Sequence, residues 1–216
     1  MFVLGLTGSI GMGKSAAATI FRRHNIPVYD ADFVVHELLG KNGTAVEPVA
    51  DLFEGVVSCG QVDRKALGKQ VFEDANALYN LEAILHPLVR GRQLKFLKSA
   101  ANHRQPIVVL DIPLLFETGG EVNCHAVAVV SAPHYLQKIR VMARRGMTEE
   151  KFQGILARQM HDREKRRRAN FVIPTGLGKR RSLQSIKSII KVVKKAPSPN
   201  FLCSSKAGLR LRGIDA

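Results

Sequence analysis

The chain has 216 residues, of which 45% are apolar and 24% are charged, a composition typical of a folded globular protein. This length allows one sizeable core with inserted subdomains but is short for two independent domains. No apolar run approaches the roughly 20 residues that a membrane helix needs, and no basic segment precedes Met1-Phe2-Val3. We therefore expect a cytoplasmic protein without a membrane partner.

The net charge of +15 is concentrated in the last third of the chain. Residues 138–195 contain 18 Lys and Arg against 4 Asp and Glu, whereas residues 1–137 contain 12 against 13. A basic segment of this kind needs its own explanation, such as an acidic or phosphate-bearing partner. The cysteines, Cys59, Cys124 and Cys203, are widely spaced and form no Cys-x-x-Cys pair, which indicates free thiols and no disulfide framework or zinc site.

The first expected element is a buried strand over residues 2–6 that runs into a glycine-rich loop and then a helix. Residues 8–15, Gly-Ser-Ile-Gly-Met-Gly-Lys-Ser, match the phosphate-binding pattern Gly-x-x-x-x-Gly-Lys-Ser. Its glycines let the backbone N–H groups converge on a polyphosphate at the positive end of the helix. The pattern predicts a polyphosphate ligand with Mg²⁺, with Lys14 on the β- and γ-phosphates and the Ser15 hydroxyl on the metal. The residues predicted to contact the nucleotide are Gly8, Ser9, Ile10, Gly11, Met12, Gly13, Lys14, Ser15 and Ala16.

A second strand over residues 26–29 ends in Asp30-Ala31-Asp32. Ligands of open α/β sheets bind at the carboxyl ends of the strands, where the phosphate loop also opens. We therefore expect one carboxylate to face the transferred phosphoryl group, and we favour Asp32. Asp30 is equally suited to cap the following helix, and capping is the structural alternative for either residue.

Residues 33–101 have helical spacing with loop breaks. A long helical pattern opens at Asp74 and is interrupted at His86-Pro87, where we expect a kink because proline removes a backbone hydrogen bond. His86 and Arg90 are four residues apart and share one face of a helix. They form either a polar site or a solvated pair beside the kink.

Two further apolar runs, residues 107–113 and 126–130, predict strands covered on both faces. Asp111, near the end of the first run, is placed to hold Mg²⁺ through water or to serve as a turn residue before Pro113. After the second run, Ser131-Ala132-Pro133 predicts a helix start with Ser131 as its cap.

The segment from Gln137 to Arg168 predicts two basic helices separated by Gly146, with Thr148 capping the second. We interpret them as a lid that closes over nucleotide phosphates with arginines such as Arg144, and a solvated basic face is the alternative. Residues 169–174 predict a last strand and 179–195 a last helix. Residues 196–216 have too little apolar content to pack and predict a flexible basic tail.

Five motifs occur in the order found in dephospho-coenzyme A kinases, and the chain resembles this family over roughly residues 1–195. They are the loop Thr7 to Ser15, Asp30-Ala31-Asp32 followed by His36, His86-Pro87-x-x-Arg90, the run from Asp111 to Glu117, and Arg144 followed by Ala169-Asn170-Phe171-Val172-Ile173. The resemblance implies transfer of the ATP γ-phosphoryl group to the ribose 3′-hydroxyl of dephospho-CoA, the last step of coenzyme A synthesis. It also implies an α/β fold of the phosphate-loop NTPase, nucleoside-monophosphate-kinase-like type, with three layers and a five-stranded parallel sheet.

The same resemblance implies one kinase domain over 1–195, with a core of residues 1–32, 104–135 and 169–195. It places the CoA-binding helical region at 33–103 and the lid at 136–168. It further implies that Asp32 accepts the proton of the attacking hydroxyl and that Arg144 reaches the ATP phosphates. Acceptor-binding residues would be Thr7, Asp32, His86, Arg90, Leu114 and Phe116, and the metal residues Ser15 and Asp111. The chain differs from the usual pattern at Asn170, where Asp is common, and at Pro174-Thr175-Gly176.

Two other interpretations compete with this one. The first is another small-metabolite or nucleoside monophosphate kinase built on the same loop, which acceptor preference would distinguish. The second is an RNA-binding or acidic-surface-binding protein that uses nucleotide as a switch, for which the basic last third is the only support.

Overall fold

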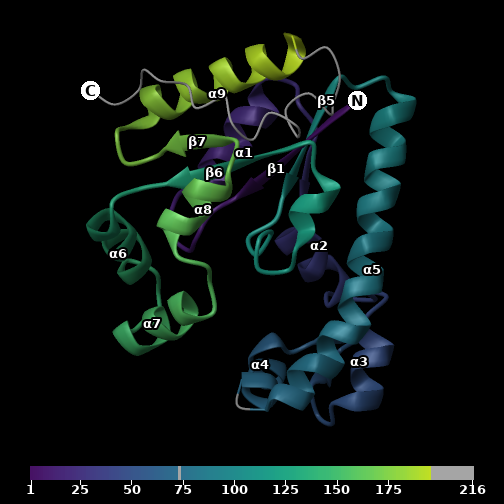
Figure 1. Ribbon diagram of the computed structural model, residues 1–216. Helices are drawn as coiled ribbons and strands as arrows, with labels where there is room; N and C mark the ends of the chain where they lie inside the picture. The colour runs from purple at the N-terminus through teal and green to yellow at the C-terminus, as the bar shows by residue number, and fades with distance from the viewer. Residues whose placement is uncertain (73, 196–216) are drawn as a thin grey trace. The chain divides into compact units, whose positions relative to one another are not determined.

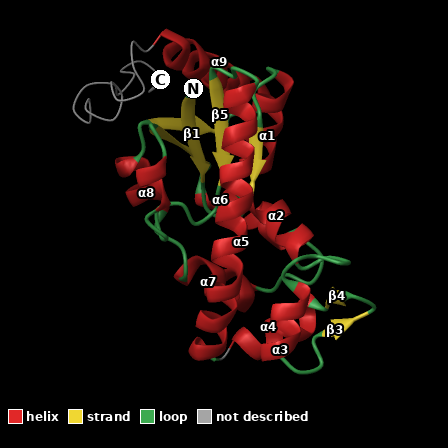
Figure 2. Cartoon of the chain, turned by 90° about the vertical axis from the view of Figure 1, so that its right-hand side faces the viewer, coloured by secondary structure: helices red, strands yellow, loops and turns green. Residues whose placement is uncertain are grey.

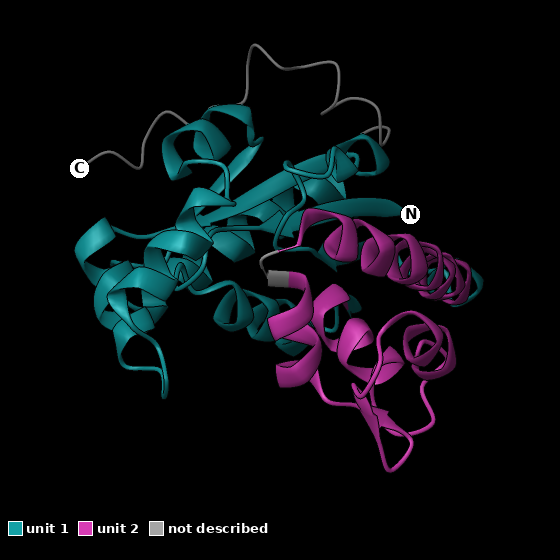
Figure 3. Ribbon diagram, turned by 90° about the horizontal axis from the view of Figure 1, so that it is seen from below, with its two compact units in different colours: residues 1–29, 100–216 teal, residues 30–99 magenta. Residues whose placement is uncertain are grey.

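The computed structural model describes residues 1–72 and 74–195. It divides the chain into two compact units (Figure 3). The first, which we call the sheet unit, contains Met1–Tyr29 and the chain from Ala100 onward, and the second, the helical unit, contains Asp30–Ser99. The predicted tail, residues 196–216, lies outside the described residues.

A five-stranded sheet in the order β2-β5-β1-β6-β7 organises the sheet unit (Figure 1). Its strands are β1 (Phe2–Thr7), β2 (Val28–Asp30), β5 (Ile107–Asp111), β6 (Ala126–Ser131) and β7 (Phe171–Pro174). β1 pairs in parallel with β5 and β6, and β6 pairs in parallel with β7. The near-continuous apolar runs are fully buried in β1 and β5, as expected for central strands covered on both faces. The predicted α/β fold with a five-stranded parallel sheet is confirmed.

Helices cover both faces of this sheet (Figure 2). On one face α1 (Lys14–Arg23) and α9 (Lys179–Lys195) share a core with alternate residues of the strands, including Phe2, Leu4 and Leu6. On the other face α8 (Asp162–Arg168) packs against β6. The basic residues of α9 are explained by its two faces. Ile186, Ile189 and Val193 are buried in that core, and the lysines between them are exposed to solvent.

The predicted lid segment contains α6 (His134–Met142), α7 (Glu149–Ala157) and α8. The expectation of one helix running from Glu149 to Arg168 is wrong, because α7 ends at Ala157 and α8 begins only at Asp162. Ser131 as the cap of α6 is also wrong: it is the last residue of β6, and its hydroxyl donates to Asp162 instead. The Thr148 cap is confirmed, since its side chain accepts from the Lys151 N–H. A short 3₁₀ helix, η1 (Gly120–Asn123), precedes β6.

His125 and Cys124 lie in the turn that leads into β6. The Nδ1 atom of His125 accepts a hydrogen bond of 2.8 Å from the Val3 N–H, and burial lowers the pKa of this imidazole. Burial likewise raises the pKa of the Cys124 thiol to about 12. Both side chains therefore pack against β1 in their uncharged forms.

The helical unit contains α2 (Ala31–Leu38), α3 (Val46–Leu52), a hairpin of β3 (Val57–Ser58) and β4 (Gln61–Val62), and α4 (Arg64–Phe72). It also contains most of α5 (Ala75–Asn102). Asp63 and Asp74 cap α4 and α5 through their side-chain oxygens. The expected interruption at Pro87 is wrong in one respect, because α5 continues through this proline. No helix of the described residues is both long and apolar enough to cross a membrane.

Candidate active site

The loop between β1 and α1 has the backbone shape of a phosphate nest. Gly11 and Gly13 have φ angles of 75° and 89°, in the left-handed region that side chains other than glycine rarely adopt. A Cβ added at Gly13 would also lie 3.2 Å from the Thr175 side chain. The turn is closed by a 3.1 Å hydrogen bond from the Met12 N–H to the Ser9 carbonyl oxygen. These restraints form a concave loop at the N-terminus of α1, where anions bind.

Lys14, the loop lysine, is ion-paired with Asp111 at the end of β5. The Lys14 Nζ atom lies 2.7 Å from Asp111 Oδ1, and the two side chains are 14% and 2% exposed. The pairing of β1 with β5 explains the contact, because Leu6 and Asp111 are partners in that register. The structure thus brings together two residues 97 positions apart that the sequence placed in one site.

The donor set suits a magnesium ion held mainly by the nucleotide. Ser15 is an exposed residue in the first turn of α1. Asp111 supplies the carboxylate that is ion-paired with the neighbouring Lys14. Within residues 1–72 and 74–195, no group of three or more His, Cys, Asp or Glu residues could hold a metal alone. Mg²⁺ commonly keeps several waters and takes one or two protein oxygens besides phosphates, so this sparse set fits it.

Three predicted acceptor-binding residues of the sheet unit, Thr7, Leu114 and Phe116, lie in different surroundings. The Thr7 side chain is fully buried, and its hydroxyl donates a 2.8 Å hydrogen bond to the Pro113 carbonyl oxygen. Phe116 is 5% exposed and lies beneath the Arg168 guanidinium, 4.8 Å from the ring centroid. Leu114 is 39% exposed. Of the three, only Leu114 presents a large apolar side chain to solvent.

Two arginines of the predicted lid, Arg144 and Arg140, differ in their surroundings. Arg144 follows α6 and is exposed. Arg140, which the sequence did not single out, donates to the Thr175 carbonyl oxygen at 2.8 Å and to the Gly11 carbonyl oxygen at 3.4 Å. The Thr175 hydroxyl donates in turn to the Met12 carbonyl oxygen. The turn at 174–176, where the chain departs from the usual family pattern, is thereby tied to the phosphate loop.

Asn170, the other departure, has a backbone role. Its side-chain oxygen accepts a 2.9 Å hydrogen bond from the Val127 N–H, and its own N–H donates to the Val127 carbonyl oxygen. An amide is sufficient for this contact, so the exchange of Asp for Asn leaves the strand entry intact.

The remaining predicted residues belong to the helical unit. Asp30 caps α2, since its Oδ1 atom accepts from the Phe33 N–H at 3.0 Å. Asp32 lies in the first turn of the same helix. His86 and Arg90 are exposed residues one turn apart on α5. The structure therefore assigns Asp30 the cap, one of the two roles that the sequence left open.

Sequence reasoning missed two glutamines that contact the loop. Gln137 on α6 is 3% exposed and donates to the Ile10 carbonyl oxygen, and Gln159 accepts from the Ile10 N–H. The signal for Gln137 was its position on the inner face of a helix, where an uncharged polar residue is unusual. Gln159 follows the end of α7 and carried no such signal.

The sheet unit combines a parallel sheet, a first strand that enters a Gly-x-x-x-x-Gly-Lys-Ser loop, and a carboxylate of the adjacent strand on the loop lysine. These features define the phosphate-loop class of nucleotide-binding proteins. Between β6 and β7, helices α6 and α8 add basic residues to this arrangement.

Comparison with known proteins narrows the class. The family described as dephospho-CoA kinase matches residues 2–177. A dephospho-CoA kinase of Paramagnetospirillum magneticum is 57% identical over 77% of this chain and 78% of its own length. The crystal structure of TT1252 from Thermus thermophilus is 36% identical with a TM-score of 0.78, covering 88% of this chain and 96% of that one. Dephospho-CoA kinase from Campylobacter jejuni is 27% identical with a TM-score of 0.67, over 89% and 97% of the two chains.

The chain belongs to the dephospho-CoA kinase family. Members of this family are transferases that carry out the ATP-dependent phosphorylation that completes coenzyme A synthesis. The resemblance seen in the sequence is confirmed.

Proposed function

We propose that the chain transfers the γ-phosphoryl group of ATP to the ribose 3′-hydroxyl of dephospho-CoA, with the phosphate loop and Lys14 holding the donor. The observation that carries this proposal is the restrained nest at residues 8–15 with the Lys14 ammonium on the Asp111 carboxylate. When ATP enters, Lys14 moves its ammonium from Asp111 toward the β- and γ-phosphates, where it neutralises charge. The ion pair keeps this lysine at the loop before the nucleotide arrives.

Asp32 acts on the acceptor. Its carboxylate accepts the proton of the attacking 3′-hydroxyl and orients the oxygen in line with the γ-phosphorus, while the bond from that phosphorus to the leaving oxygen of ADP breaks. Positioning and neutralisation of charge do most of the work in such transfers. Arg144, exposed on the lid segment, supplies a guanidinium to the transferring group.

Dephospho-CoA is recognised through residues that are open to solvent. His86 and Arg90 on α5 offer a polar pair, and Leu114 offers apolar contact. Thr7 and Phe116 support the acceptor side from within the sheet unit, because their side chains are buried against Pro113 and Arg168. Ser15 and Asp111 would hold Mg²⁺, which when bound shields the negative charge of the triphosphate.

The first test is ATP-dependent ADP release with dephospho-CoA, AMP, shikimate and pantothenate as separate acceptors. Turnover confined to dephospho-CoA is expected. Turnover with another acceptor would favour a different metabolite kinase, and none with any acceptor, despite ATP binding, would favour a nucleotide switch with an acidic partner.

The second test replaces the proposed base. Asp32→Asn should lower kcat by a factor on the order of a hundred or more, because a general base contributes about 10²- to 10⁴-fold. Asp51→Asn, which changes an exposed carboxylate on α3 of the same unit, is the matched control and should leave kcat unchanged. Near-normal turnover by a folded Asp32→Asn protein would remove Asp32 from this role.

A further inference from the structure

Two side chains hold the peptide groups on either side of Ile10, at the tip of the phosphate loop. The Gln159 Oε1 atom accepts a 3.0 Å hydrogen bond from the Ile10 N–H, and Gln137 Nε2 donates a 2.8 Å bond to the Ile10 carbonyl oxygen. Gln137 comes from α6 and Gln159 from the segment after α7, so they lie on opposite sides of the helix α7 in the sequence. The predicted lid, residues 136–168, is therefore joined to the loop at two points, one before α7 and one after it.

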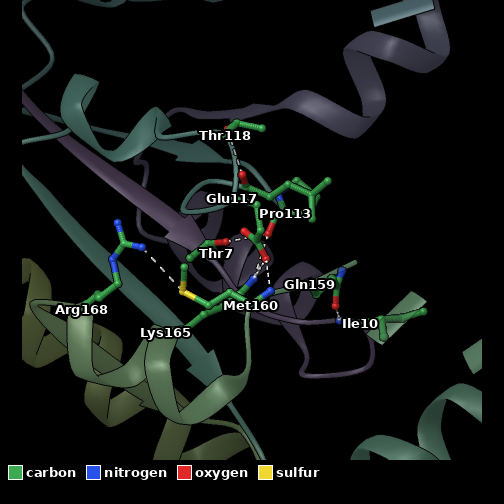
Figure 4. A network of polar contacts seen from close by, with 10 residues as sticks. Thr7, Ile10, Pro113, Glu117, Thr118, Gln159, Met160, Lys165 and Arg168 are labelled. Carbon is green, nitrogen blue, oxygen red and sulfur yellow. Dashed lines mark hydrogen bonds and ion pairs between the residues drawn. The ribbon is translucent and has the colours of Figure 1, made fainter. Parts of the chain in front are cut away.

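The residue after Gln159 is anchored by a second set of contacts (Figure 4). The Met160 N–H donates a 2.8 Å hydrogen bond to Glu117 Oε1, which also lies 2.8 Å from the Lys165 ammonium. Lys165 is fully buried and also donates to the Pro113 carbonyl oxygen, the group that accepts from Thr7. This network fixes the backbone from which the Gln159 side chain projects.

The contacts of Met160 and of Gln137 indicate that Gln159 holds the loop in place. The alternative is that Gln159 binds the Ile10 N–H only until a phosphate of ATP replaces it. A competitor for the phosphate should be able to withdraw, but the backbone beside Gln159 is held by a buried ion pair. The other peptide group of Ile10 is held by Gln137, which is almost fully buried. Breaking a buried ion pair is costly because it leaves an uncompensated charge, so the pair of Lys165 and Glu117 favours one position of the backbone beside Gln159.

We propose that Gln159 is a positioning residue, which keeps the phosphate loop in its nucleotide-binding form and joins the predicted lid to it. The inference rests on the proposed function only for its kinetic test. A loop that adopts the competent form part of the time binds ATP more weakly by that fraction. Loss of one neutral hydrogen bond corresponds to about a 3- to 10-fold change in the equilibrium constant between the competent and other forms of the loop.

The experiment compares the intact protein with Gln159→Met, which keeps the length of the side chain and removes the acceptor. We expect the KM for ATP to rise about 3- to 10-fold with the KM for dephospho-CoA and the melting temperature little changed. The matched control is Gln153→Met, the same substitution at an exposed glutamine of α7 that bonds Glu149. It should leave all three quantities unchanged.

Amide hydrogen exchange at Ile10 gives a readout that does not depend on turnover. Protection of this N–H should be present in the wild type, remain with a non-hydrolysable ATP analogue, and be lost in Gln159→Met. Gln159→Glu, which retains an acceptor oxygen, should restore the protection, and it serves as the second variant if Gln159→Met does not fold.

Two results would overturn the proposal. A lower KM for ATP in Gln159→Met would show that the glutamine competes with a phosphate, and equal exchange at Ile10 in both proteins would show that the bond does not hold the loop. If the wild type failed to phosphorylate dephospho-CoA, the proposed function would fall, while calorimetric affinity for the ATP analogue and exchange at Ile10 would still decide the role of Gln159.

Discussion

The sheet unit and the helical unit hold their proposed functional residues in different ways. In the sheet unit, Lys14 and Asp111 are nearly buried and paired, and Ile10 is held by two glutamine side chains. In the helical unit, His86 and Arg90 lie exposed on α5. The proposed polyphosphate site is thus built from paired, mostly buried side chains, whereas the acceptor contacts proposed for the helical unit come from exposed side chains of one long helix. The two regions should therefore respond differently to substitution.

The largest effect is expected from breaking the buried ion pair of the sheet unit. Lys165→Met should lower the free energy of unfolding by about 3 kcal/mol, because a buried carboxylate then lacks its partner. The double variant Lys165→Met/Glu117→Gln should regain most of this loss. Urea unfolding of both proteins measures it. Arg167→Met, at an exposed pair with Glu164 whose side chains are 73% and 39% exposed, is the control and should cost under about 1 kcal/mol.

The loop lysine should affect catalysis more than stability. We expect Lys14→Ala to lower kcat by a factor on the order of a hundred or more, since the charge on the transferring phosphates loses its cation. Steady-state turnover, with circular dichroism to verify folding, measures the effect. Lys187→Ala, an exposed lysine on α9, should turn over normally. A folded Lys14→Ala protein with near-normal kcat would contradict the assignment of the loop.

In the helical unit, the proline inside α5 should be a weak point. Pro87→Ala should raise the free energy of unfolding by about 1 to 3 kcal/mol, because alanine restores a helical hydrogen bond and relieves a clash. Pro48→Ala is the matched control, as Pro48 lies in the first turn of α3, where proline is tolerated. Native-state hydrogen exchange of the α5 amides measures this free energy in both variants and the wild type. Equal stability of Pro87→Ala and the wild type would mean that α5 already accommodates the ring.

The smallest effect concerns the pH dependence of the sheet unit. Burial lowers the pKa of His125, so the unfolded chain binds a proton that the folded one resists, and stability should fall as the pH drops below about 6.5. His125→Asn can still accept from the Val3 N–H but does not titrate, and its stability should fall less between pH 7.5 and 5.5. Urea unfolding at the two pH values measures this difference, and identical slopes would contradict it.

Local pattern was sufficient for part of this molecule. The strand, loop and helix at residues 2–23 follow from an apolar run, glycines that need positive φ, and the Lys-Ser pair. The caps at Asp63, Asp74 and Thr148 were predictable for the same reason, because each bonds a backbone N–H two or three residues away. The five-stranded parallel sheet followed from the family resemblance and from the repeated strands and helices.

Contacts between distant residues that belong to no recognised motif were not predictable. Gln159 lies 149 residues from Ile10, and nothing in its own neighbourhood indicates that partner. The break between α7 and α8 was not predictable because basic and apolar residues keep helical spacing across it, whereas the Met160 N–H donates to Glu117 and does not continue the helix. The roles of Asp32, Arg144, His86 and Arg90 remain predictions.

The position of α9 has a consequence for co-translational folding. β1 lies in the middle of the sheet, yet its neighbours β5 and β6 begin at Ile107 and Ala126, and the core they share is closed by Ile186, Ile189 and Val193. Synthesis is vectorial, so the first strand emerges long before the surfaces that cover it. Pairings over such separations form slowly and leave apolar strands exposed. The segment that carries the phosphate loop is thus synthesised well before the strands and the helix that cover it, and its apolar residues stay exposed until α9 has been made.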